Sequence, residues 1–167
     1  VEVLTNAERY KIILFNMPEM DFEESKKFIN LGVVINERGE VLMIRRAQPE
    51  KGKDGSALTW AFPGGKQRFK ETREECVKRE VLAETGYDTQ SIKQIALDFH
   101  RQFPVMIVYH LCKLSSPEPV SDPSEPHEVA EIRWVKPAEI KSLITTILNP
   151  KVAAELGIDK LRKNLDF

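Results

Sequence analysis

The chain has 167 residues, of which 41% are hydrophobic and 31% are charged, and its 25 basic and 26 acidic residues leave a formal net charge of −1. This length suits one domain with an ordinary core, and the composition excludes an intrinsically disordered chain and a membrane chain. The balanced charge excludes capture of nucleic acid or of an anionic membrane by the overall field, so a polyanionic ligand has to be bound by local chemistry.

The first segment, residues 1–27, mixes charged residues with scattered apolar positions and contains Pro18. We expect it to form a helix or strand that packs on the main domain as an N-terminal extension. It lacks the basic-then-apolar order of a secretion signal, so the expected location is the cytoplasm. The two cysteines, Cys76 and Cys112, lie among apolar residues, a pattern that favours buried, reduced thiols.

A β-hairpin is predicted next. Residues 28–35 and 40–46, "FINLGVVI" and "EVLMIRR", are rich in β-branched and aliphatic side chains, and the "NERG" around their junction supplies the residues of a turn. The segment that follows, residues 47–57, is polar and contains glycine. It predicts a mobile loop.

One helix has clear signals at both ends. Thr72 is followed three residues later by Glu75, which is the spacing of a capping box, where each side chain bonds a backbone N–H at the helix start. Gly86 suits the left-handed position that follows a helix end. We therefore predict a helix that runs from Thr72 to Thr85.

Three strands and two helices are predicted downstream. The strands are residues 91–102, 105–114 and 130–135, and the helices are residues 136–144 and 151–164. An acidic, proline-rich loop at residues 115–128 joins the last two strands, and it contains four prolines and four acidic residues. Loops of this length are usually functional or disordered. No repeat or domain boundary is visible, so residues 1–167 are interpreted as a single domain.

The predicted helix carries Glu80 and Glu84 four residues apart, so the two carboxylates project from one face, one above the other. Like charges this close destabilise a helix unless a positive group lies between them, and Arg79 is expected to point elsewhere around the helix. A hard divalent cation suits this position, since Mg²⁺ is bound by one or two carboxylates together with water and substrate phosphates. A solvated helix face with salt bridges is the alternative, and the spacing alone leaves both open.

The wider pattern resembles the signature of the Nudix hydrolases, G-x5-E-x7-R-E-U-x-E-E-x-G-U, in which U is an aliphatic or bulky apolar residue. The matching positions are Gly65, Glu71, Arg79, Glu80, Val81, Glu84, Gly86 and Tyr87. The preceding "WAFPGG" is also similar to what many members of the family carry. One position departs: Ala83 stands where the signature has the first of two adjacent glutamates, so a cluster of three glutamates is reduced to two.

The resemblance implies an α/β fold, a Nudix-like α/β/α sandwich around a mixed β-sheet. It also implies a pyrophosphohydrolase that depends on Mg²⁺, with Mn²⁺ as an alternative ion. The implied metal ligands are Glu80, Glu84 and a carbonyl in the glycine turn, which we match to Gly64. In the family an arginine–glutamate contact holds the loop against the helix, and Arg79 and Glu71 are the corresponding pair.

Hydrolysis also needs a base that accepts a proton from the attacking water, and the family draws it from different places. Glu128 lies at the end of the acidic, proline-rich loop, close to where some members keep such a residue, and Glu131 and Glu80 are its rivals. The implied catalytic residues are then Arg79, Glu80, Glu84 and Glu128.

Substrate contacts are expected from Arg45, Arg46 and Lys66, whose cationic groups suit phosphate oxygens. Alternating side chains face opposite sides of a strand, so at most one of the two arginines is expected to point at the site. Phe62 is a candidate for stacking on a nucleobase, with a place in the core as the alternative.

The expected substrate is a small-molecule nucleotide, a nucleoside triphosphate or its oxidised form, because "TWAFPGGK" is most similar to family members of that group. An ADP-ribose or nucleotide-sugar pyrophosphatase stays open as an alternative. So does a Nudix-fold sensor that binds a nucleotide without cleaving it, a reading that Ala83 favours and the retained Glu80 and Glu84 oppose. A homodimer is compatible with the resemblance, and no membrane partner is expected.

Overall fold

The computed structural model of the chain describes residues 27–51, 55–100, 103–145 and 147–158. The strands are β1 (Phe28–Ile35), β2 (Val41–Lys51), β3 (Ala57–Ala61), β4 (Gly64–Lys66), β5 (Thr89–Phe99), β6 (Met106–Leu114) and β7 (Val129–Val135). The helices are α2 (Arg73–Thr85), α3 (Pro137–Leu143) and α4 (Pro150–Glu155). Nearly all of the predicted N-terminal extension and residues 159–164 of the second predicted C-terminal helix lie outside the described residues. Within them this helix is shorter than predicted, since α4 ends at Glu155 and Gly157 follows with a left-handed φ of 69°.

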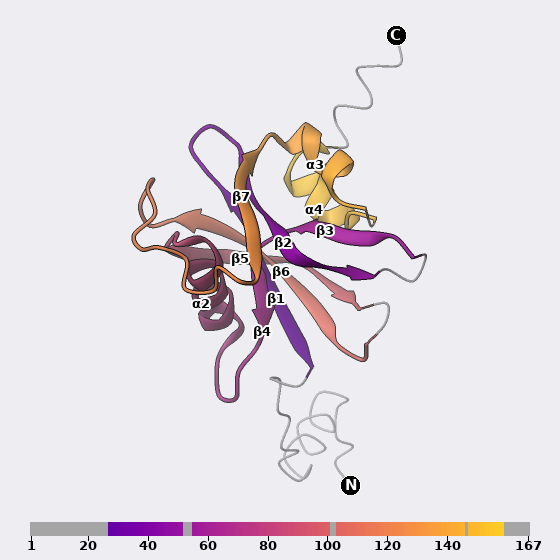
Figure 1. The fold of residues 1–167 in the computed structure, drawn as a ribbon, viewed down its shortest axis with the longest axis horizontal. Helices are drawn as coiled ribbons and strands as arrows, with labels where there is room; N and C mark the ends of the chain where they lie inside the picture. The colour runs from indigo at the N-terminus through magenta and orange to yellow at the C-terminus, as the bar shows by residue number, and fades with distance from the viewer. Residues whose placement is uncertain (1–26, 52–54, 101–102, 146, 159–167) are drawn as a thin grey trace, which may run out of the picture.

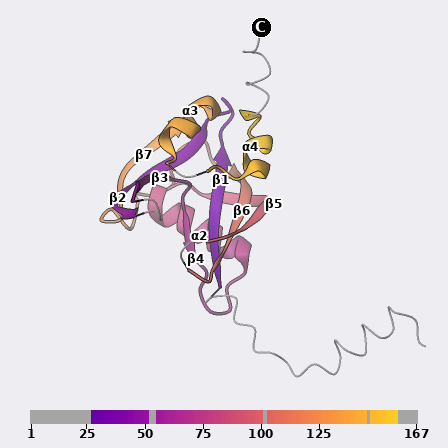
Figure 2. The same ribbon diagram turned by 90° about the vertical axis from the view of Figure 1, so that its right-hand side faces the viewer.

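The described strands form one mixed sheet (Figure 1). Its order is β3-β2-β1-β6-β5, with β4 paired to β1 and β7 paired to β2. The β1–β6 pair is parallel, and the other pairs are antiparallel. With helices on both faces of this sheet (Figures 1 and 2), the predicted α/β sandwich is confirmed.

Each face of the sheet has its own apolar core, because neighbouring residues of a strand point to opposite sides. On β1, Val33 packs with Ile140 of α3 and Val152 of α4, whereas Val34 packs with Val77 and Val81 of α2. All six of these side chains are fully buried. The helix that carries the two glutamates is therefore fixed to the sheet by its apolar side.

The predicted hairpin turn is present, but its strands separate soon after it. Asn36 closes the turn by accepting the Gly39 N–H, and β1 pairs with β2 at Ile35 and Val41. Toward the N-terminal end of β1, the strand β4 replaces β2 as its partner. Gly32 donates its N–H to the Pro63 carbonyl at 2.8 Å. This separation places the glycine turn inside the sheet.

The loop predicted at residues 47–57 is partly wrong. Strand β2 continues to Lys51 and β3 begins at Ala57, with Glu50 opposite Leu58 and a register shift between Arg45 and Glu50. Side chains 47–51 are exposed. Backbone pairing extends β2 and β3 here without burial of side chains, so the polar sequence does not indicate a strand.

Both ends of α2 are as predicted. Glu75 donates its N–H to Thr72 Oγ1 at 3.1 Å, and Glu75 Oε2 accepts the Thr72 N–H at 2.9 Å, which completes the capping box. Gly86 follows the helix with a φ of 76°. A Cβ at this residue would also overlap the Ser121 carbonyl oxygen, so only glycine fits here.

The acidic, proline-rich loop lies against the C-terminal end of α2. Ser124 donates its N–H to the Ala83 carbonyl at 2.9 Å, and Val120 donates to the Gly86 carbonyl at 2.8 Å. These bonds satisfy carbonyl groups that a helix end otherwise leaves unpaired. The loop is thereby attached beside Glu84, and it ends at Glu128.

The two cysteines are free and buried, as predicted. Burial raises the pKa of each thiol to about 12. None of the helices in the described residues is long and apolar enough to cross a membrane.

Candidate active site

Glu84 is a buried carboxyl group in the last turn of α2, and only 7% of the residue is exposed. Its Oε2 accepts the Gly64 N–H at 2.8 Å. Burial raises the pKa of Glu84 to about 8, and the charge of Glu80 acts in the same direction. A carboxylate at this position lacks solvation, so its ionised form gains strongly from a nearby cation.

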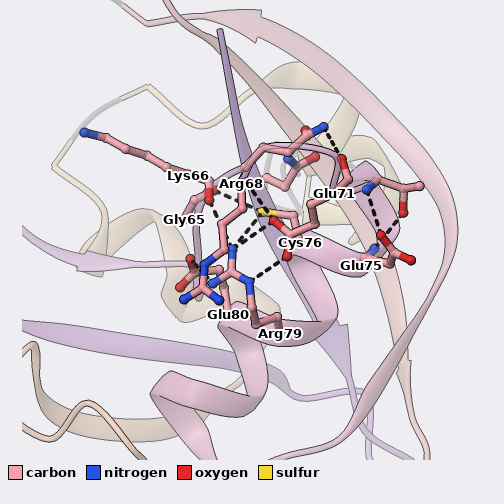
Figure 3. A network of polar contacts seen from close by, with 11 residues as sticks. Gly65, Lys66, Arg68, Glu71, Glu75, Cys76, Arg79 and Glu80 are labelled. Carbon is pink, nitrogen blue, oxygen red and sulfur yellow. Dashed lines mark hydrogen bonds and ion pairs between the residues drawn. The ribbon is translucent and has the colours of Figure 1, made fainter. Parts of the chain in front are cut away.

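Glu80 lies one turn before Glu84 and is held by Arg79 (Figure 3). Arg79 Nη1 donates to Glu80 Oε1 at 2.6 Å, while its Nε and Nη2 donate to the two oxygens of Glu71 at 2.6 and 3.0 Å. The predicted Arg79–Glu71 pair is confirmed. The expectation that Arg79 points away from the glutamates is wrong, because its long side chain reaches the carboxylate of the next residue.

The glycine turn fits tightly over this helix face. A Cβ on Gly65 would stand 2.6 Å from Glu80 Cδ, a separation that real Cβ atoms do not show. Arg79 Nη2 also donates to the Lys66 carbonyl at 3.2 Å. Glycine at residue 65 thus lets the loop and the carboxylate of Glu80 pack together.

A cavity of about 330 Å³ opens beside Glu84. It is lined by Ile44, Arg46, Gln48, Phe62, Gly64, Glu84, His127 and Glu128. Of the predicted site residues, the structure therefore brings five together here, from β2, the glycine turn, α2 and the end of the acidic loop. Glu80 and Arg79 lie just outside its lining, on the preceding turn of α2.

The two arginines of β2 lie on opposite faces of the sheet, as the alternation predicts. Arg46 lines the cavity and bonds Glu50 through Nη1 at 3.2 Å, but its buried Nε has no hydrogen-bond partner among the described residues. Arg45 instead bonds Glu131 at 3.2 Å. Arg45 is therefore not brought to the cavity, and the exposed side chain of Lys66 is not part of its lining either.

Glu131, a rival for the base, is engaged elsewhere. It accepts hydrogen bonds from Arg133 at 2.6 and 2.9 Å and from Arg45. The hydrogen bond from Arg133, joined by that from Arg45, lowers the pKa of Glu131. Glu128 is among the residues that line the cavity, and Glu131 is not.

Sequence reasoning missed three residues of the cavity. Ile44 and Gln48 continue the face of β2 that carries Arg46, at the two-residue period of a strand. This period could have identified them only if β2 had been predicted to continue through the polar residues after Arg46. His127 lies beside Glu128, with Nε2 3.8 Å from Glu128 Oε1, and no motif marks it.

Phe62 lines the cavity and also belongs to the core. It is 4% exposed, and its ring contacts that of Tyr109 edge-on at a centroid distance of 6.2 Å. The side chain forms a firm apolar wall.

The donor set suits a magnesium ion that is completed by substrate and water. Within the described ranges, no three His, Cys, Asp or Glu side chains are placed to hold a metal ion by themselves. The desolvated carboxyl of Glu84, with Glu80 one turn away and the Gly64 backbone in contact, matches a site of two carboxylates. The residues present therefore fit Mg²⁺ bound together with phosphate oxygens.

Comparison with known proteins assigns the family. The model of the NUDIX domain matches residues 29–156, and the chain belongs to this family. A putative 8-oxo-dGTP diphosphatase of Bacillus subtilis (strain 168) is 27% identical over 108 residues, which span 65% of each protein. The match therefore spans less than two-thirds of the length of this curated relative.

Solved structures show the same fold. An ADP-ribose pyrophosphatase from Streptococcus suis 89-1591 has a TM-score of 0.53 and 22% identity, over 81% of this chain and 92% of that one. A MutT protein from Methanosarcina mazei Go1 has a TM-score of 0.55 and 23% identity, over 82% and 95%.

Proposed function

We propose that the protein is a Mg²⁺-dependent pyrophosphohydrolase that cleaves a nucleoside diphosphate linked to another group, with a nucleoside triphosphate or its oxidised form as substrate. The observation that carries this proposal is the meeting of the buried Glu84 carboxyl and the Arg46 guanidinium at one cavity. An ionised Glu84 gains from a metal cation and Arg46 suits a phosphate oxygen, so a metal-bound phosphate matches both groups. The family membership and the name of the Bacillus relative support it.

Each residue then has a role in the reaction. Glu80, Glu84 and the carbonyl of Gly64 would hold Mg²⁺, or Mn²⁺ in its place. When bound, the ion neutralises the diphosphate charge and lowers the pKa of a bound water. Arg46 orients a phosphate oxygen, and Glu128 accepts the proton of the attacking water.

A nucleotide sensor is the alternative with an observation in its favour, because Ala83 removes one carboxylate of the family signature. Purified protein with Mg²⁺ should be tested on a panel of nucleoside triphosphates, 8-oxo-dGTP and ADP-ribose, with phosphate and pyrophosphate release measured separately. We expect turnover that EDTA abolishes, fastest on a triphosphate. Binding without release of any product would establish the sensor, and preference for ADP-ribose would correct the substrate.

Glu128→Gln is expected to lower kcat about 100-fold or more with little change in KM, since a general base acts on the chemical step. Steady-state kinetics across pH on the best substrate of the panel measures this. Glu118→Gln, at an exposed residue of the same loop, is the matched control. If Glu131→Gln lost more activity than Glu128→Gln, the role of base would pass to Glu131.

The cytoplasmic location and the homodimer stay predictions. The Nudix fold is compatible with both.

A further inference from the structure

Four polar side chains form a continuous hydrogen-bonded chain across the sheet on the face that α2 covers. Ser91 of β5 contacts His110 of β6, His110 contacts Asn30 of β1, and Asn30 contacts Gln67 in the loop before α2, each at 2.9 Å. Gln67 then donates to the carbonyl of Glu71 at 2.8 Å. Asn30, His110 and Gln67 are at most 4% exposed.

The direction of every bond in this chain follows from its last member. The Glu71 carbonyl can only accept, so Gln67 presents its NH₂ group there and its Oε1 to Asn30. Asn30 in turn gives its NH₂ to Gln67 and its Oδ1 to His110, which has to donate from Nε2. The Nδ1 of His110 is left as the acceptor for the Ser91 hydroxyl.

A neutral imidazole is required by this arrangement, since His110 acts as donor on one side and acceptor on the other. Burial lowers the pKa of His110 to about 4, and the charge of Arg73 acts in the same direction while that of Glu74 opposes it. One tautomer, with the proton on Nε2, therefore holds through the neutral pH range.

The Gln67 end of this hydrogen-bonded chain contacts the loop before α2, and that loop is joined through Glu71 and Arg79 to Glu80. Gln67 is fixed on both sides, since its own N–H donates to the Phe28 carbonyl at 3.1 Å. The side chain of Glu71 accepts the Arg68 N–H at 2.8 Å and binds Arg79, which holds Glu80. Figure 3 shows Glu71 and Glu80 on either side of Arg79.

We propose that Gln67, Asn30 and His110 are positioning residues, and that the chain from Ser91 to Glu71 fixes the loop so that Arg79 presents Glu80 to the metal. The proposal rests on the proposed function for its last step. Gln67 has a specific role. It joins Asn30 of the sheet to the carbonyl of Glu71, and the carboxylate of Glu71 binds Arg79. A network of buried polar groups in which each nitrogen and oxygen has a hydrogen-bond partner favours one conformation.

The test begins without metal, so that it does not depend on the reaction. Backbone hydrogen exchange of Arg68 and Glu71 is measured by NMR in EDTA for the wild type, Gln67→Met and Ser91→Ala. Val152→Ala, which truncates a fully buried side chain in the core on the opposite face, is the control, compared at equal global stability. We expect exchange about tenfold or more faster in Gln67→Met than in the control, and a smaller increase in Ser91→Ala.

The second measurement is the affinity for Mn²⁺ alone, by electron paramagnetic resonance. We expect Gln67→Met to weaken Mn²⁺ binding about tenfold or more, as loss of partners behind metal ligands does, and Val152→Ala to leave it unchanged. ¹⁵N spectra of the wild type should show His110 with its proton on Nε2 from pH 5 to 8.

Three results would overturn the proposal. The first is equal exchange of the loop in Gln67→Met and Val152→Ala, and the second is faster exchange with unchanged Mn²⁺ affinity. The third is faster loop exchange in Gln67→Met but unchanged exchange in Ser91→Ala. That result would show that only the local contact of Gln67, and not the whole hydrogen-bonded chain, fixes the loop. A wild type that binds no Mn²⁺ would instead contradict the proposed function, and the exchange data would still decide whether the chain fixes the loop.

Discussion

Glu80→Gln is expected to lower kcat about a thousandfold or more, a loss of roughly 4 kcal/mol of transition-state stabilisation, while the fold is kept. The amide has nearly the shape of the carboxylate but lacks its charge, and it cannot serve as an anionic ligand of a hard cation. Arg79 retains its two bonds to Glu71, so the loop stays attached to α2.

The measurement is single-turnover kinetics with Mg²⁺ on the substrate that the panel selects, together with a thermal melt of each variant. Glu37→Gln, at an exposed residue of the β1–β2 turn, is the matched control and should retain wild-type activity. Activity of Glu80→Gln near that of the control would contradict the role of Glu80.

Glu84→Gln is expected to abolish turnover and, without metal, to make the protein more stable at alkaline pH. The folded-state pKa of Glu84 is about 8, above the ordinary value of 4.5, so the folded protein holds this proton more tightly than the unfolded chain does. The contribution of this group to stability is therefore fully present below pH 4.5 and is lost as the pH rises to about 8. The loss is about 1.4 kcal/mol for each pKa unit, so the total is a few kcal/mol.

The amide of Glu84→Gln stays neutral and can still accept the Gly64 N–H, so the variant should escape this loss. Urea unfolding in EDTA should give similar free energies of unfolding for the two proteins at pH 4, and a higher value for the variant at pH 9. Addition of Mg²⁺ should stabilise the wild type alone. A wild type without this pH-dependent decline would show that Glu84 is ionised when metal-free.

The parts of the fold that could be predicted are those specified by neighbouring residues. Thr72, Glu75 and Gly86 define the ends of α2 through bonds that span a few residues, and period-two patterns locate the buried strands. The replacement of β2 by β4 beside β1 could not be predicted, because it depends on Gly32 meeting the Pro63 carbonyl, a long-range contact that leaves no local pattern.

The candidate site divides in the same way. The spacing of Glu80 and Glu84 follows from helix geometry, and the separation of Arg45 from Arg46 follows from strand geometry. The contact between Arg79 and Glu80 could not be predicted, since a long side chain can take several directions from the same backbone position.

The attachment of the acidic, proline-rich loop has a consequence for how this protein can diverge. The bonds that hold it to Ala83 and Gly86 come mainly from backbone N–H groups, and any residue except proline can supply such a group. Most side chains of the loop are therefore interchangeable while the segment keeps its path. Substitutions in this loop can then change the residues that line the cavity, such as His127 and Glu128, without a change in the helix α2 that carries Glu80 and Glu84.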